Sequence, residues 1–83
     1  MKNKSNISLK EIFSEAVQQY KKRNIKVAEN YCIKILSIEP NHFDSIFMLA
    51  TLSAIKNDYE KAKQLLHRAI KIQPENPSAY NNF

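Results

Sequence analysis

Few side chains in this sequence could take part in chemistry, and their spacing does not bring them together. Cys32 could act as a nucleophile or a metal ligand, but the residue 34 positions later is Leu66, and a buried thiol behaves mainly as a small hydrophobic group. His42 and His67 have no ligand spacing between them. Pairs such as Glu11 and Glu15 are typical of solvated charges along one helix face. We therefore expect no catalytic residue, no metal site and no cofactor.

The composition favours one small helical domain. The chain has 83 residues, of which 43% are hydrophobic, and it contains three prolines and no glycine. The absence of glycine argues against tight β-turns and excludes a glycine-rich phosphate loop. The net charge is +5, but lysine and arginine are scattered apart from the run at 21–23. That run falls at the end of a predicted helix, where cations offset the helix dipole, so we expect no nucleic-acid partner.

No segment of the sequence predicts export or membrane insertion. Residues 1–8 carry positive charge without a following apolar run, which argues against a signal peptide. No stretch approaches the length of a membrane-spanning helix, so we expect no membrane partner. The single cysteine fits a reducing compartment. We therefore expect a cytoplasmic protein, and its richness in lysine, asparagine and isoleucine suits an AT-rich bacterial genome.

The strongest feature is an internal repeat of 34 residues. When residues 9–42 are written above residues 43–76, small, large and proline residues all coincide, which chance would rarely produce. The identical pairs are Ile12 and Ile46, Phe13 and Phe47, Ala16 and Ala50, Lys22 and Lys56, Ala28 and Ala62, Ile38 and Ile72, and Pro40 and Pro74.

Each repeat predicts two antiparallel helices. We expect helices over 9–22, 25–38, 43–55 and 59–72. Ser8 and Glu11 have the spacing of a capping box, and Asp58 is the expected cap of the last helix. Pro40 and Pro74 close the repeats because proline cannot continue a helix. The short connections require successive helices to pack antiparallel.

This pattern resembles the tetratricopeptide repeat, a 34-residue helix–turn–helix unit. The resemblance covers residues 9–83 and implies an all-α solenoid, a fragment of a right-handed superhelix. It divides the chain into a tail (1–8), a first repeat (9–42), a second repeat (43–76) and the truncated start of a third (77–83). The residues that carry it are Ile12, Ala16, Ile25, Ala28, Cys32, Ile35 and Pro40, then Ile46, Leu49, Ala50, Tyr59, Ala62, Leu66, Ala69 and Pro74, then Ala79, Tyr80, Asn82 and Phe83.

Several positions depart from the family pattern. Arg23–Asn24 and Asn57–Asp58 stand in the turns, where the family often has glycine. Glu15 and Gln19 are polar where the family has a leucine and an aromatic residue, whereas Leu49 and Ser53 take those places one repeat later. A terminal repeat needs a polar outer face, so we expect the first repeat to be the N-terminal end of a stack.

In this family the first helix of each repeat lines a concave groove that receives a peptide. The resemblance implies groove residues Phe13, Val17, Tyr20, Lys21, Phe47, Thr51, Ala54, Ile55 and Asn82. Two interpretations of the phenylalanines stay open: they line an apolar groove, or they fold into the core between the repeats. Apolar side chains at Phe13, Val17 and Met48 disfavour the carboxylate clamp of one branch. A single asparagine, Asn82, gives little support to the asparagine ladder of another.

The C-terminal end predicts self-association. The last predicted helix carries an apolar stripe too wide for one partner helix, and only a stub follows it. We expect a homodimer or oligomer through a face formed by Leu65, Ile70, Ile72, Tyr80 and Phe83.

These observations favour a binding protein without enzymatic activity. The first expectation is a scaffold that holds a partner peptide or helix in its groove. The alternative is an N-terminal accessory segment of a larger bacterial transferase, of the glycosyltransferase or sulfotransferase kind, with the catalytic domain downstream. A nucleic-acid binder is a distant third.

Overall fold

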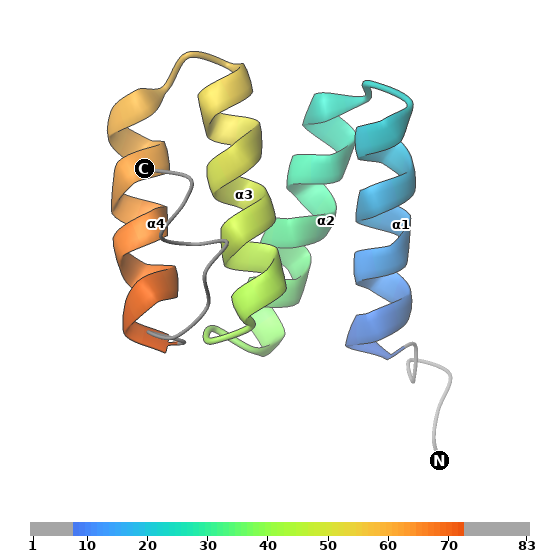
Figure 1. Cartoon of the computed structure of the whole chain (residues 1–83). Helices are drawn as coiled ribbons and strands as arrows, with labels where there is room; N and C mark the ends of the chain where they lie inside the picture. Colours follow the sequence, from blue (N-terminus) through green and yellow to red (C-terminus); the bar gives the residue numbers. More distant parts are fainter. Residues whose placement is uncertain (1–7, 73–83) are drawn as a thin grey trace.

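Four helices form a single row of two hairpins in the computed structural model, which describes residues 8–72 (Figure 1). They are α1 (Leu9–Lys21), α2 (Ile25–Ile38), α3 (Phe43–Ile55) and α4 (Tyr59–Ile72). The main contacts join α1 to α2, α2 to α3 and α3 to α4. The all-α fold expected from the sequence is therefore confirmed, and each helix ends within one residue of its predicted range.

The helix starts follow from local capping. At α1 the Ser8 hydroxyl accepts from the Glu11 backbone N–H, and the Glu11 carboxylate accepts from the Ser8 N–H, each at 3.1 Å. At α3 the His42 Nδ1 accepts from the Ser45 backbone N–H at 3.2 Å. At α4 the Asp58 carboxylate accepts from the backbone of Lys61 at 3.3 Å. The capping box and the Asp58 cap are thus confirmed, and His42 also has a capping role.

Both hairpin turns use a left-handed residue without glycine. Arg23 has φ 67° and Asn57 has φ 66°, and these two residues are 34 positions apart. A left-handed residue ends each first helix and reverses the chain into the second. Asparagine tolerates this conformation, whereas for arginine the conformation has an unfavourable steric energy.

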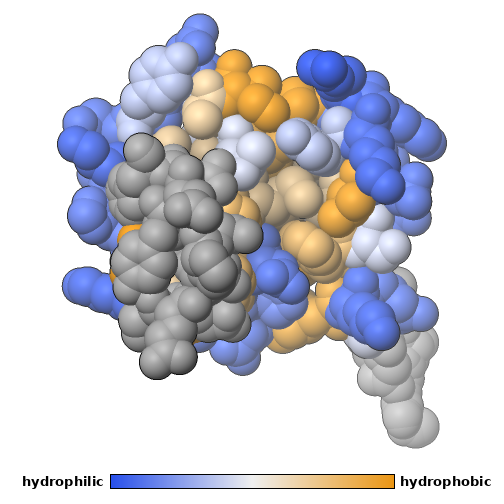
Figure 2. All heavy atoms as spheres, in the orientation of Figure 1, coloured by the Kyte–Doolittle hydropathy of each residue, from blue (hydrophilic) through white to orange (hydrophobic). Residues whose placement is uncertain are grey.

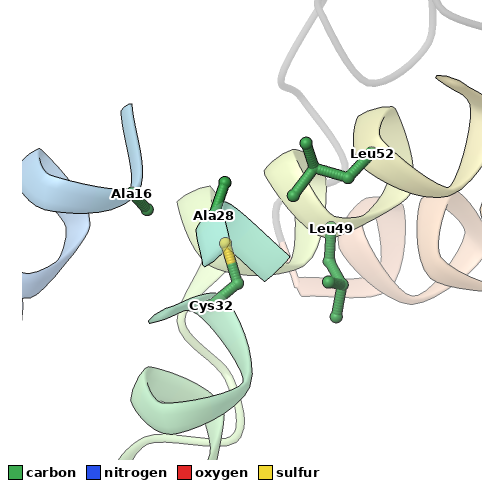
Figure 3. Packing of buried hydrophobic residues seen from close by; sticks show 5 residues of the cluster. All are labelled: Ala16, Ala28, Cys32, Leu49 and Leu52. Carbon is green, nitrogen blue, oxygen red and sulfur yellow. The ribbon is translucent and has the colours of Figure 1, made fainter. Parts of the chain in front are cut away.

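Small residues bring the helices together in the core (Figure 3). Ala16 of α1 and Ala28 of α2 have no exposed surface, and Cys32 lies beside them. Leu49 and Leu52 of α3 complete this first cluster, so that it joins both repeats. A second cluster contains Phe43, Ile46 and Ala69, between α3 and α4. The alanines allow close approach of the paired helices, as expected.

Candidate functional site

An apolar cavity of about 360 Å³, here called the α1–α3 cavity, lies between the first helices of the two repeats. Its lining residues are Phe13 and Tyr20 of α1 together with Asp44, Phe47, Met48 and Thr51 of α3. Figure 2 shows hydrophobic residues gathered across the middle of this face, between hydrophilic residues along its two outer edges. The volume suits one or two side chains of a bound segment.

Ring contacts hold the two phenylalanines in place. The Phe13 ring lies 5.9 Å from the His42 ring, centroid to centroid, and is tilted by 51°. The Phe47 ring stacks on Phe43 at the same centroid distance. Phe13 and Phe47 are both half-buried, and both line the cavity. Phe47 also packs against the second core cluster. The two interpretations of these residues stay predictions.

The other predicted groove residues divide among neighbouring surfaces. Tyr20 and Thr51 line the α1–α3 cavity with the phenylalanines. Lys21 and Ile55 line a cavity of about 370 Å³ at the turn end of the helices. Val17 is half-buried on α1. Asn82 lies outside the described residues.

The groove residues expected from the sequence did not include two lining residues of the α1–α3 cavity, Asp44 and Met48, although Met48 stands at one of the places considered for a carboxylate clamp. Both share a helical face with Thr51, because residues at spacings of three, four and seven lie on one side of a helix. That spacing could have identified them. Asp44 is exposed and brings a carboxylate to a surface that is otherwise apolar or hydroxylic.

A second cavity of about 380 Å³, here called the α3–α4 cavity, lies on the other side of α3. It is lined by Phe47, Ala50, Thr51 and Ala54 of α3 and by Tyr59, Ala62, Lys63 and Leu66 of α4. Ala54, a predicted groove residue, therefore lies here. Tyr59 is 65% exposed at the edge of this cavity.

The predicted self-association residues are only partly accessible. Leu65, Ile70 and Ile72 are half-buried and pack against the second core cluster, and Leu65 also contacts the first. The most exposed large hydrophobic residues in the described chain are others: Val27, Ile33, Ile38, Ile55 and Tyr59. Tyr80 and Phe83 lie outside the described residues. The self-association face stays a prediction.

A nearly buried carboxylate links the two repeats. Glu29 of α2 is 5% exposed and accepts from the Lys56 ammonium group at 3.1 Å and 3.0 Å through its two oxygens. Burial, with a smaller contribution from the negative Glu29, raises the pKa of the neighbouring Cys32 thiol from 9.0 to about 12. Cys32 is thus a protonated core residue at neutral pH, as expected, and is a poor nucleophile.

Within residues 8–72, no three or more histidine, cysteine, aspartate or glutamate side chains gather as metal ligands would. In the same part of the chain, every helix is too short or too polar to span a membrane.

Comparison with known proteins agrees with the geometry. A family model for the tetratricopeptide repeat matches residues 31–64. That match is one full period long (64 − 31 + 1 = 34) and runs from the middle of α2 through α3 into α4. The chain is also 28% identical over 76 residues to the UDP-N-acetylglucosamine--peptide N-acetylglucosaminyltransferase of Caenorhabditis elegans. The alignment covers 92% of this chain but only 7% of that relative.

The described helices and their 34-residue period agree with the helical-hairpin fold of the tetratricopeptide repeat, and residues 31–64 match the family model of that repeat. Repeats of this kind generally mediate contacts between proteins, so a protein partner is the functional class that the fold supports.

Proposed function

We propose that this protein is an interaction scaffold that binds a segment of a partner protein in the α1–α3 cavity. The observation that carries this proposal is the meeting of Phe13 and Phe47, equivalent residues of the two repeats, in one apolar cavity. Because the sequence repeats, α1 and α3 place the same residue type on one shared surface. Neither phenylalanine is fully buried, so both can contact a ligand.

The lining indicates the chemistry of the bound segment. Phe13, Phe47 and Met48 offer apolar and aromatic surface to an aliphatic or aromatic anchor side chain. Asp44 and the Thr51 side chain provide the polar contacts that would orient the segment, although the Thr51 hydroxyl also donates to the Phe47 carbonyl at 3.1 Å. Lys21 and Arg23 add positive charge at the turn end. We propose binding without catalysis for this part of the chain, in the cytoplasm.

A second function is favoured by the transferase relative. The chain spans 7% of the length of that protein, so it is comparable to one portion of a much larger polypeptide. We propose as the alternative that these repeats serve as an accessory segment of a larger transferase. The sequence of the complete gene tests this: a transferase domain after the repeats supports it, and its absence rules it out. A bacterial origin stays a prediction from composition.

Self-association is the remaining expectation about partners. We keep it as a proposal for the face of Leu65, Ile70 and Ile72, half-buried though they are. Sedimentation of the whole chain at several concentrations tests it, and one monomeric species at high micromolar concentration would contradict it.

The groove proposal is tested with peptides selected on the protein from a random display library. Bound peptides should shift the backbone amide resonances of α1 and α3 around Phe13 and Phe47. Phe13→Ala should weaken binding, whereas Val27→Ala is the matched control, because Val27 is a 42% exposed hydrophobic residue of α2 outside the cavity. Equal affinities for both variants and the parent would contradict the proposal. Thermal unfolding of each variant separates lost binding from lost stability.

A further inference from the structure

The α3–α4 cavity is the counterpart, one repeat later, of a surface that α3 itself covers. Adding 34 to Ala16, Ala28 and Cys32 gives Ala50, Ala62 and Leu66. In the first repeat these positions have no exposed surface, and they form one core cluster with Leu49 and Leu52 of α3 (Figure 3). In the second repeat they are 2%, 6% and 8% exposed and line the α3–α4 cavity. The chain therefore contains its own example of what fits this surface, which is an apolar helix.

The charge of one residue at this surface is reversed between the two repeats. In the first repeat Glu29 accepts both hydrogen bonds from Lys56, which lies at the C-terminal end of the covering helix α3. The equivalent of Glu29 in the second repeat is Lys63, which lines the α3–α4 cavity. A lysine at the end of a covering helix would meet Lys63 as a like charge, whereas a carboxylate there would form the reverse pair.

We propose that the α3–α4 cavity binds an amphipathic helix of a protein partner that carries a carboxylate opposite Lys63. That helix has apolar residues at the spacing of Leu49 and Leu52, to cover Ala62 and Leu66. It has aspartate or glutamate at the place that Lys56 occupies in α3, seven residues after Leu49 (56 − 49 = 7) and near its C-terminal end. Ala50, Ala54 and Ala62 leave room for close approach.

A second copy of this chain fits the cavity less well. The helix equivalent to α3 is α1, and its corresponding positions are Glu15 and Gln18, which are polar, and Lys22, which repeats the charge of Lys56. The corresponding face of α3 is buried within its own molecule against α1 and α2. Both first helices therefore end in a lysine that would oppose Lys63. The positive charge of Lys63 therefore favours a helix of another protein that has a carboxylate at this place.

Two fluorescein-labelled helical peptides test this. Each keeps Met48, Leu49 and Leu52 at their spacing in α3, has polar residues on the opposite face, and differs only at the place of Lys56, which is glutamate in one peptide and lysine in the other. Fluorescence anisotropy with the full chain measures both affinities. The glutamate peptide should bind roughly tenfold or more tightly than the lysine peptide, because like charges across an interface are strongly disfavoured.

The charge reversal on the protein completes the test. Lys63→Glu should invert the preference, so that the lysine peptide binds more tightly. Lys61→Glu makes the same change of charge on α4 outside the cavity lining and should keep the preference of the parent. An unchanged preference in Lys63→Glu would overturn the proposal, and so would no binding of either peptide at about 1 mM, which corresponds to a negligible affinity. A third outcome would also overturn the proposal: the chain binds neither peptide, forms a dimer, and the dimer dissociates when Ala54 is replaced by arginine. That result would show that a second copy covers the cavity.

These measurements test only the α3–α4 cavity. The Phe13→Ala variant tests the α1–α3 cavity separately.

Discussion

The Lys56 ammonium group reaches both carboxylate oxygens of Glu29, at 3.1 Å and 3.0 Å, across the boundary between the two repeats. The two residues are 27 positions apart, and one closes α3 whereas the other lies inside α2. Glu29 is 5% exposed, so its carboxylate depends on this partner for hydrogen bonds in the core. The pair therefore connects α3 to α2 through one carboxylate.

Removing the lysine should destabilise the protein by about 1–2 kcal/mol, because it leaves Glu29 buried without a partner. The Lys56 side chain is 46% exposed, which keeps the loss below that of a fully buried pair. Urea unfolding of Lys56→Met measures it. The double variant Glu29→Gln with Lys56→Met should recover part of the loss. A Lys56→Met variant as stable as the parent would show that Glu29 is hydrated without its partner.

Enlarging the equivalent alanines should have unequal effects. Ala28→Leu should lower the free energy of unfolding by about 1–3 kcal/mol, because Ala28 has no exposed surface and α3 packs over it. Ala62→Leu should cost clearly less, because Ala62 borders the α3–α4 cavity of about 380 Å³. Thermal unfolding of the two variants decides it. Equal losses would mean that the cavity offers no room for the added side chain.

Glycine should relieve the strain of the first hairpin turn. Arg23→Gly should raise the free energy of unfolding by up to about 1 kcal/mol, since relief of the left-handed cost exceeds the entropy that glycine adds to the unfolded chain. Asn57→Gly should change it less, because asparagine tolerates this conformation and the Asn57 amide oxygen also accepts from the Tyr59 hydroxyl at 2.9 Å. Urea unfolding of both variants provides the comparison. A larger gain at Asn57 would contradict the expected order.

Alkaline pH should destabilise the protein through Cys32. The pKa of the folded thiol is about 12 and its ordinary value is 9.0, so between these values the unfolded chain has lost a proton that the folded chain keeps. The free energy of unfolding therefore falls as pH rises above 9, and below that value the thiol contributes no slope. Urea unfolding at about pH 8 and about pH 10.5 should show a larger loss for the parent than for Cys32→Ala, which accounts for the other titrating groups. Parallel losses would show that the folded thiol ionises normally.

The helices could be predicted from sequence because their boundaries depend on local signals. The pairing of Ser8 with Glu11, and the proline after α2, act within a few residues. The small difference at α1, which ends at Lys21 with Lys22 as its cap, follows from the left-handed turn at Arg23. Which first-helix residues share a cavity was predictable in part, since Phe13 and Phe47 follow from the period alone.

Contacts between the repeats could not be predicted in the same way. The ion pair of Glu29 with Lys56 depends on the angle between α2 and α3, which a period of 34 residues does not specify. The apolar stripe of α4 likewise does not indicate which of its sides faces inward. Ala62 and Leu66 are buried and border the α3–α4 cavity, whereas Leu65 is half-buried and packs against both core clusters. The helical spacing predicts one apolar stripe but does not indicate which of its members are most buried.

The order of contacts along the row of helices has a consequence for how the chain acquires its structure. Each helix packs mainly on the next one in the sequence, so no long loop has to close before a stabilising contact forms. Such a topology of local contacts is associated with rapid folding. A hairpin formed anywhere in the row can serve as a nucleus, and structure can spread from it in either direction as further helices are synthesised.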